Sequence, residues 1–220
     1  MIQPPAALAA KAHIRSLEEY RRQYRLSLDD PEGFWRKQSE ILTWFHPPQQ
    51  IFDADLREVD FSWYGGGRLN ACHNCVDRHL ATRGDKPAIL WAGDEPGDYR
   101  SITYRKLKHM VCRIANVLLA HGVTKGDRVA LYMPMIPELA ATMLACARIG
   151  AVHSVVFAGF SAESLRGRIL DAGAKLVVTA NEGLRGGKWI PLKTTVDRAV
   201  EGLAFVTSVL VARRTETEVP

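Results

Sequence analysis

The sequence predicts an α/β fold in which a parallel sheet is covered by helices, because short apolar runs alternate with amphipathic segments over residues 128–213. The segments between the runs have the length of helices. The runs are rich in β-branched residues and almost continuously apolar, as expected of strands that are buried on both faces. Such alternation is typical of parallel sheets whose strands are joined by helices. The four runs are RVALYM (128–133), VHSVVF (152–157), KLVVTA (175–180) and SVLVAR (208–213).

The first part of the chain is predicted to be helical, followed by an extended stretch. Ser16 and Glu19 have the spacing of a capping box, which predicts a helix over residues 16–26. Asp30-Pro31 begins a second helix, since proline is favoured at the first helical position. Residues 51–70 alternate loosely and contain three consecutive glycines, which predict a flexible surface turn.

A helix, a hairpin and a longer helix are predicted to come next. Residues 70–84 (NACHNCVDRHLATRG) place apolar side chains at helical spacing and end in glycine. The runs KPAILWAG and YRSITY flank DEPGD, which predicts a hairpin. Thr103 can cap the following helix, and His121-Gly122 ends it.

We divide the chain into residues 1–84, a helical and extended N-terminal region, and residues 85–220, a partial α/β subdomain. The sheet stops after its fourth strand, which predicts a piece of a longer protein, with a small complete domain as the alternative. A truncated sheet would leave apolar surface uncovered, so we also expect self-association.

Composition argues against several classes of protein. The chain has 29 Lys and Arg against 24 Asp and Glu, but these charges form no basic run or tail, so nucleic-acid binding is not predicted. No stretch of 18 apolar residues predicts a membrane helix, and the Ala-rich start lacks the basic flank of a signal peptide. Four cysteines without framework spacing predict free thiols in a reducing, cytoplasmic compartment.

Motifs for metal binding or catalysis are weak. The spacing of Cys72 and Cys75, with His73 and His79 nearby, matches half of a zinc site or a redox pair. A structural role is favoured, because cysteine in an amphipathic helix is more often a small buried apolar residue. No Ser/His/Asp set or pair of carboxylates can be placed, and His153 is expected to be a core histidine with satisfied hydrogen bonds. We therefore assign no catalytic residue and no metal ligand.

The loops that follow the predicted strands are the places to look for a ligand, because open α/β sheets bind ligands beyond the carboxyl ends of their strands. The loop after Met133, PMIPE, lacks the glycines of a dinucleotide site. Residues 157–161 form a small-residue turn into a helix that Ser161 can cap. Its free amides can hold an anion or a carbonyl, and an ordinary strand-to-helix turn is the alternative.

The third loop contains EGLRGGKW (182–189), which resembles a phosphate loop. A Walker A loop has four residues between its glycines and a hydroxyl after its lysine, whereas Gly183 and Gly187 enclose three residues and Trp189 replaces the hydroxyl. It therefore fails as an ATP loop. Arg185 and Lys188 remain suited to phosphate oxygens without a metal, and a solvated basic loop is the alternative.

Three stretches together resemble the AMP-forming acetyl-CoA synthetases, which belong to the adenylate-forming superfamily with the acyl-CoA synthetases and luciferase. The resemblance covers about Tyr20 to about Arg214. Its most specific part is the block from Gly126 to Phe160. The stretches are LNACHNCVDRHL, GDRVALYMPMIPELAATMLACARIGAVHSVVFAGFSAESLRGRILDAGAKLVVTANEGLR and IPLKTTVD.

The resemblance implies a ligase that activates acetate with ATP and Mg²⁺ to acetyl-adenylate and pyrophosphate, and then passes the acetyl group to CoA with release of AMP. It implies small-molecule substrates, and ATP, Mg²⁺ and acetate sites outside these 220 residues. The chain would then be the N-terminal part of a large domain and inactive by itself. The alternatives are another short-chain acyl-CoA synthetase, such as a propionyl enzyme, and a free-standing binding domain without catalysis.

Part of a CoA site falls within the chain if the resemblance is followed residue by residue. One family loop contacts the CoA phosphates and another lies along the adenine and pantetheine. The first loop matches Arg185, Gly186, Gly187 and Lys188, and the second matches Phe157, Ala158 and Gly159. Lys188 stands where bacterial relatives often have arginine, so the charge is kept without the bidentate fork. Ala158 stands where many relatives have glycine.

Overall fold

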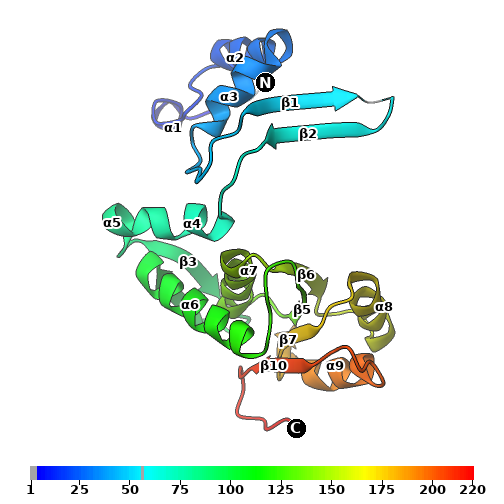
Figure 1. Ribbon diagram of the computed structural model, residues 1–220. Coiled ribbons are helices and arrows are strands. Elements are labelled where there is room, and N and C mark those ends of the chain that lie inside the picture. The colour runs from blue at the N-terminus through cyan, green and yellow to red at the C-terminus, as the bar shows by residue number, and fades with distance from the viewer. Residues whose placement is uncertain (1–3, 56) are drawn as a thin grey trace. The chain divides into compact units, whose positions relative to one another are not determined.

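A computed structural model describes residues 4–55 and 57–220 (Figure 1). Its internal contacts divide the chain into two units, Met1–Leu69 and Asn70–Pro220. Within the described residues, no helix combines the length and the apolar character needed to cross a membrane.

Within its described residues, the first unit contains three helices and an antiparallel strand pair. Ser16 accepts a hydrogen bond from the Glu19 amide at 3.1 Å, and Asp30 accepts one from the Gly33 amide at 2.9 Å, so both predicted helix starts are confirmed. The strand pair was not predicted. Phe52 and Trp63 lie opposite each other in it, with ring centroids 4.5 Å apart. The elements are α1 (Ala6–Ala9), α2 (Leu17–Asp29), α3 (Pro31–Ser39), β1 (Gln50–Asp55) and β2 (Asp60–Gly65).

The second unit is built around a four-stranded parallel sheet with the strand order β10-β7-β5-β6 (Figure 1). The predicted hairpin β3-β4 and the helix that follows it are confirmed. Thr103 caps this helix by accepting from the Lys106 amide at 3.2 Å. The elements through the first sheet strand are α4 (Ala71–Cys75), η1 (Asp77–His79), α5 (Leu80–Arg83), β3 (Pro87–Ala92), β4 (Tyr99–Thr103), α6 (Tyr104–Ala120) and β5 (Arg128–Met133). The remaining elements are α7 (Pro137–Ile149), β6 (Val152–Phe157), α8 (Ala162–Ala172), β7 (Leu176–Ala180), β8 (Gly183–Arg185), β9 (Lys188–Ile190), α9 (Leu192–Val200) and β10 (Ser208–Ala212).

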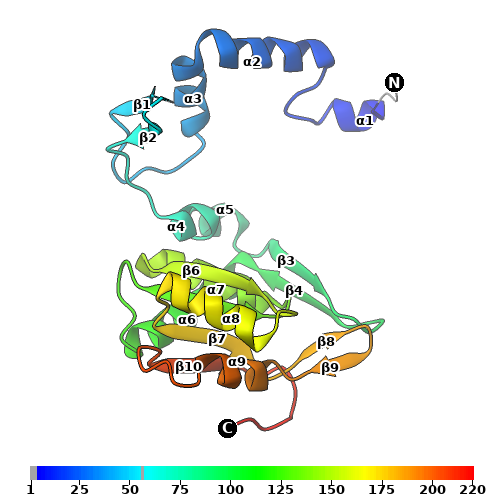
Figure 2. The same cartoon turned by 90° about the vertical axis from the view of Figure 1, so that its right-hand side faces the viewer.

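Helices cover both faces of the sheet, which confirms the predicted α/β class. Helices α6 and α7 pack together on one face, and α8 and α9 pack together on the other (Figures 1 and 2). The central strands β5 and β7 are buried over most of their length. Strand β6 lies at the edge, so Val152, Val155 and Phe157 are exposed, and the prediction that this run is buried on both faces is wrong.

Two helices end at glycines that close the chain back toward the sheet. Gly150 after α7 and Gly173 after α8 both adopt left-handed backbone, with φ of 75° and 56°. The next amides, of Ala151 and Ala174, donate to carbonyls in the last helical turn. A side chain at either position would be strained, because only glycine adopts this conformation without cost.

The predicted helix over residues 70–84 is divided into α4, η1 and α5, and the break falls at Val76. Val76 has φ −126° and ψ −63°, outside the helical range. Directly after it, Asp77 contacts Lys108 at 3.1 Å and Arg148 at 2.5 Å. These contacts join the segment to α6 and α7. A periodic pattern of apolar residues cannot reveal a distant pair of cations, so the break was missed.

The pKa of the Asp77 carboxyl lies below its usual value. Burial alone would raise this pKa, but the hydrogen bonds and charges of Lys108 and Arg148 outweigh burial and lower it. Because the folded-state pKa is depressed, the carboxylate adds its full stability above the unfolded-state pKa of about 3.9. That stability is lost as the pH falls through the folded-state pKa.

We expect Asp77→Asn to lower the free energy of unfolding by about 2 kcal/mol at pH 7, because two charge-assisted hydrogen bonds lose their anionic acceptor. Urea denaturation measures the change. The difference from the unmodified chain should shrink below about pH 4. Asp85→Asn is the matched control, since Asp85 pairs with Arg105 on the exposed surface, and its effect should stay within about 0.5 kcal/mol. Equal effects of the two substitutions would contradict this account.

Candidate functional site

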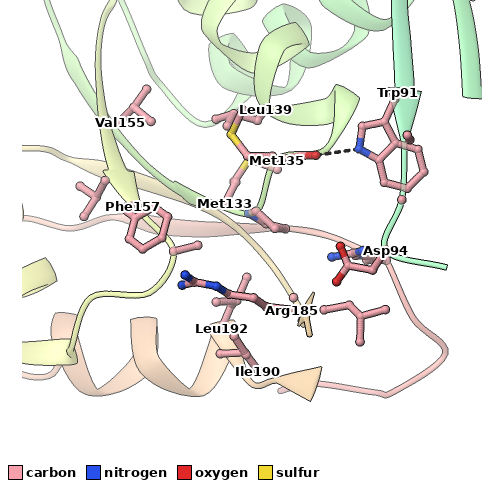
Figure 3. Close-up of a pocket in the computed structure, with 18 residues that line it drawn as sticks. Trp91, Asp94, Met133, Met135, Leu139, Val155, Phe157, Arg185, Ile190 and Leu192 are labelled. Atoms are coloured by element: carbon pink, nitrogen blue, oxygen red, sulfur yellow. Dashed lines mark hydrogen bonds between the residues drawn. The ribbon is translucent and has the colours of Figure 1, made fainter. Parts of the chain in front are cut away.

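A cavity of about 570 Å³ opens at the carboxyl ends of β5 and β6 (Figure 3). Its walls come from the ends of β3, β5 and β6, the β8-β9 hairpin and the start of α9. Strands β5 and β7 are neighbours in the sheet although β6 lies between them in sequence. Open sheets bind ligands at such a reversal of strand order, so the cavity lies where a ligand is expected.

The cavity has an apolar interior and a charged mouth. Met133, Leu139 and Leu192 line its interior. Arg185 brings positive charge and Asp94 brings negative charge (Figure 3). Arg214 adds a second positive charge to the lining. Such a lining suits a ligand that has an apolar part and an anionic end.

The loop after β6 is held in place by a buried tyrosine of β5. The Tyr132 hydroxyl donates to the Phe160 carbonyl at 2.8 Å. Burial raises the pKa of Tyr132, which keeps the hydroxyl protonated as a donor. Ser161 accepts from the Ser164 amide at 3.2 Å, which confirms the predicted cap of α8. Both hydrogen bonds therefore hold the end of the loop that leads into α8.

The segment EGLRGGKW, which was treated as a loop in the sequence, forms a β-hairpin. Gly186 and Gly187 form its two-residue turn, with φ of 54° and 71°. Positive φ at both central residues is the signature of the common hairpin turn, so the Gly-Gly pair was a signal that could have been used. Arg185 and Lys188 are direct partners across β8 and β9 and lie on the same face. Both are exposed, and neither forms an ion pair within residues 4–55 and 57–220.

The two predicted phosphate and adenine loops meet at this cavity. The Arg185 guanidinium carbon lies 5.5 Å from the centroid of the Phe157 ring, within cation–π range. Phe157, Ala158 and Arg185 line the cavity together, whereas the other four predicted residues do not contribute to its lining. Those four residues are Gly159, Gly186, Gly187 and Lys188. A binding role for all seven stays a prediction.

Arg214 reaches the cavity because Asn181 binds the C-terminal segment. The Asn181 side chain accepts from the Arg214 amide at 2.9 Å and donates to the Thr215 hydroxyl at 2.8 Å. Asn181 is 2% exposed, so these hydrogen bonds are shielded from water. Sequence reasoning missed Arg214 because no local motif surrounds it.

Trp91, Asp94 and Met135 were also missed. The loop that contains Met135 was considered and set aside because it lacks glycine. The end of β3 and the turn after it, which supply Trp91 and Asp94, showed no ligand-binding motif in the sequence.

The cysteines and His153 lie outside this cavity. Burial raises the pKa of the Cys72 thiol, and raises that of Cys146 to about 11, so both are unreactive at neutral pH. Within the described part of the chain, no three His, Cys, Asp or Glu side chains group as a metal site would require. The Nδ1 atom of His153 is buried without a hydrogen-bond partner, so the prediction of a satisfied core histidine is wrong.

We expect Gly159→Ala to displace the Phe157 ring from Arg185, because the new methyl group would lie 2.5 Å from a ring carbon. Phe157 is exposed, so the ring can move with little loss of stability. The displacement of the Arg185 δ-proton chemical shifts by the Phe157 ring current should then disappear from the NMR spectrum. Gly167→Ala is the control: it meets open space inside α8, leaves the spectrum unchanged and adds roughly 1 kcal/mol of stability. An unchanged Arg185 signal in Gly159→Ala would contradict the contact.

Two family models match the chain. The model described as "AMP-binding enzyme" matches residues 76–218, and the model described as "Acetyl-coenzyme A synthetase N-terminus" matches residues 20–75. In structure, the chain is similar to the acetoacetyl-CoA synthetase from Streptomyces lividans, with a TM-score of 0.84 and 27% sequence identity. That similarity covers 98% of this chain and 33% of the other.

Curated relatives match over almost the whole chain. It is 52% identical to acetyl-coenzyme A synthetase 2 of Pseudomonas aeruginosa over 217 residues, which cover 98% of this chain and 34% of the relative. It is 53% identical to the acetyl-coenzyme A synthetase of Syntrophus aciditrophicus, again over 98% of this chain and 33% of the relative. The chain thus spans about a third of the length of these relatives. With a family model matched over more than half of its residues, the chain belongs to the AMP-binding enzymes, as a member similar to the acetyl-coenzyme A synthetases.

Proposed function

We propose that this chain supplies part of the CoA site of a ligase that forms acetyl-CoA from acetate, ATP and CoA through an acetyl-adenylate. The relatives named acetyl-coenzyme A synthetases support this activity, since they are 52–53% identical over nearly the whole chain. The acetoacetyl-CoA synthetase is only 27% identical. Acetate is therefore favoured over a longer acyl group.

The main support for a CoA site is the stacking of Arg185 on Phe157 at the mouth of the cavity. CoA combines a nucleotide that bears three phosphates with a long, weakly polar pantetheine arm. The guanidinium of Arg185 can bind phosphate oxygens through two parallel hydrogen bonds, and Lys188 adds a second cation on the same face of the hairpin. Gly186 and Gly187 leave the turn between them without side chains that would obstruct a phosphate.

The remaining lining fits the other parts of CoA. The exposed Phe157 ring offers a stacking surface for adenine, beside Ala158 and Gly159. The apolar interior, with Met133, can pack against the pantetheine arm. Asp94 would repel phosphate. The phosphates of CoA are therefore expected on the side of the cavity mouth that carries Arg185.

We assign binding and no catalysis to these residues. Acetate activation needs ATP and Mg²⁺, whose sites we place outside this chain. Small molecules are the proposed partners, and a cytoplasmic location stays a prediction.

We expect Arg185→Ala to weaken CoA binding about fivefold, the effect of roughly 1 kcal/mol for one exposed charge–phosphate contact. Isothermal titration of CoA measures it. Arg185→Lys should recover part of the loss, because charge returns without the fork. Arg105→Ala removes an exposed arginine that does not line the cavity and should leave CoA affinity unchanged. Equal affinity of Arg185→Ala and the unmodified chain would overturn the CoA site.

Residues 1–220 alone should form no acetyl-adenylate, because the proposed adenylation residues lie elsewhere. Acetate-dependent exchange between ATP and labelled pyrophosphate measures the first half-reaction. Any exchange above the level without acetate would refute the assignment of these residues to binding only.

A further inference from the structure

Trp91 and Arg100 face each other across the β3-β4 hairpin, beside the cavity. They are direct partners in the register of the two strands. The Arg100 guanidinium carbon lies 5.4 Å from the centroid of the Trp91 ring. This cation–π distance makes the two side chains one unit on one face of the hairpin.

Both side chains reach the segment that runs from the end of β5 into the first turn of α7. The Trp91 indole N–H donates to the Met135 carbonyl at 2.7 Å (Figure 3). The Arg100 guanidinium contacts Glu138, in the first turn of α7, at 2.5 Å. Trp91, Arg100 and Glu138 are called the hairpin brace below, because they join the hairpin to this segment at two points.

The segment has weak anchors of its own at Met135. Met135 is 82% exposed, so packing does not hold it, although the neighbouring Ile136 is buried. Pro134 has no amide hydrogen to donate. The other carboxylate oxygen of Glu138 is buried without a hydrogen-bond partner, so Arg100 is the charge partner of a partly shielded anion.

The brace joins two adjacent parts of the cavity wall. Residues 91–94 at the end of β3 form one part, and residues 133–135 at the end of β5 form the other. A ligand that packs against both parts keeps its contacts only if the two parts hold their relative position, since dispersion contacts weaken sharply when a gap opens. A wall fixed beforehand also spares the ligand the cost of ordering it.

We propose that Trp91 and Arg100 are positioning residues of the CoA site, which hold residues 133–135 against the ligand through the Met135 carbonyl and Glu138. This inference rests on the proposed function, because it assigns these residues to the same cavity. Neither residue needs to touch the phosphates.

Trp91→Phe tests the proposal, because phenylalanine keeps an aromatic ring for Arg100 and removes the indole N–H. Trp44→Phe is the matched control: the Trp44 indole also donates to a backbone carbonyl, that of Ser39 at 3.0 Å, but lies in the other unit of the chain. We expect CoA affinity, by isothermal titration, to fall about fivefold in Trp91→Phe and to stay unchanged in Trp44→Phe. Amide exchange over residues 133–139 should accelerate in Trp91→Phe alone.

Arg100 is tested by a pair of substitutions. Arg100→Met keeps much of the side-chain length without charge and should weaken CoA binding by a similar factor. Arg100→Lys restores the charge toward Glu138 and the Trp91 ring and should recover affinity. If Arg100 only stabilised the fold, the CoA affinity of Arg100→Lys would change no more than its thermal stability does. That outcome would contradict the positioning role.

The outcomes separate the brace from the CoA site itself. Unchanged exchange over residues 133–139 in Trp91→Phe would overturn the brace. So would unchanged CoA affinity in Trp91→Phe when Arg185→Ala weakens binding. Equal CoA affinity of Arg185→Ala and the unmodified chain would instead overturn the proposed function, while accelerated exchange would still support the hold of Trp91 on the segment.

Discussion

Burial of the central strand β5 on both faces is the constraint on which the rest of the second unit depends. Five successive residues, from Val129 to Met133, are buried between β6 and β7 and beneath helices on either side. Each large apolar side chain in such a position contributes about 1.5–3 kcal/mol. The strand is also the support of the site, because Tyr132 binds the loop after β6 and Met133 begins the floor of the cavity.

One side of the cavity is formed by the ends of sheet strands, and the other parts come from more exposed segments. The carboxyl ends of β5 and β6 are held by the sheet, whereas the hairpin that carries Arg185 consists of two strands of three residues. Arg214 depends on the hydrogen bonds of Asn181. A binding site of this kind can fix the apolar part of a ligand precisely and let exposed cations adjust to its phosphates.

Through the hairpin brace, the β3-β4 hairpin would position one wall of the cavity. Its distance in sequence from the proposed phosphate-binding residues hides this role. Trp91 and Arg100 make one contact each to the segment after β5, and both contacts are polar and directional. Directional contacts specify a position, while apolar packing mainly supplies stability. The proposed CoA site would thus have cations that bind, an aromatic ring that stacks, and a brace that keeps one wall in place.

The sequence by itself determined the parallel sheet, its covering helices and most of their ends, because periodicity, caps and glycines act over a few residues. It also identified Phe157, Ala158 and Arg185, which the structure brings to one cavity. Only the tertiary structure decided the break at Val76, the exposure of β6 and the parts played by Trp91, Asp94 and Arg214. These depend on cations, strand neighbours and carbonyls that are distant in sequence, and no local pattern encodes which of them will meet in the folded chain.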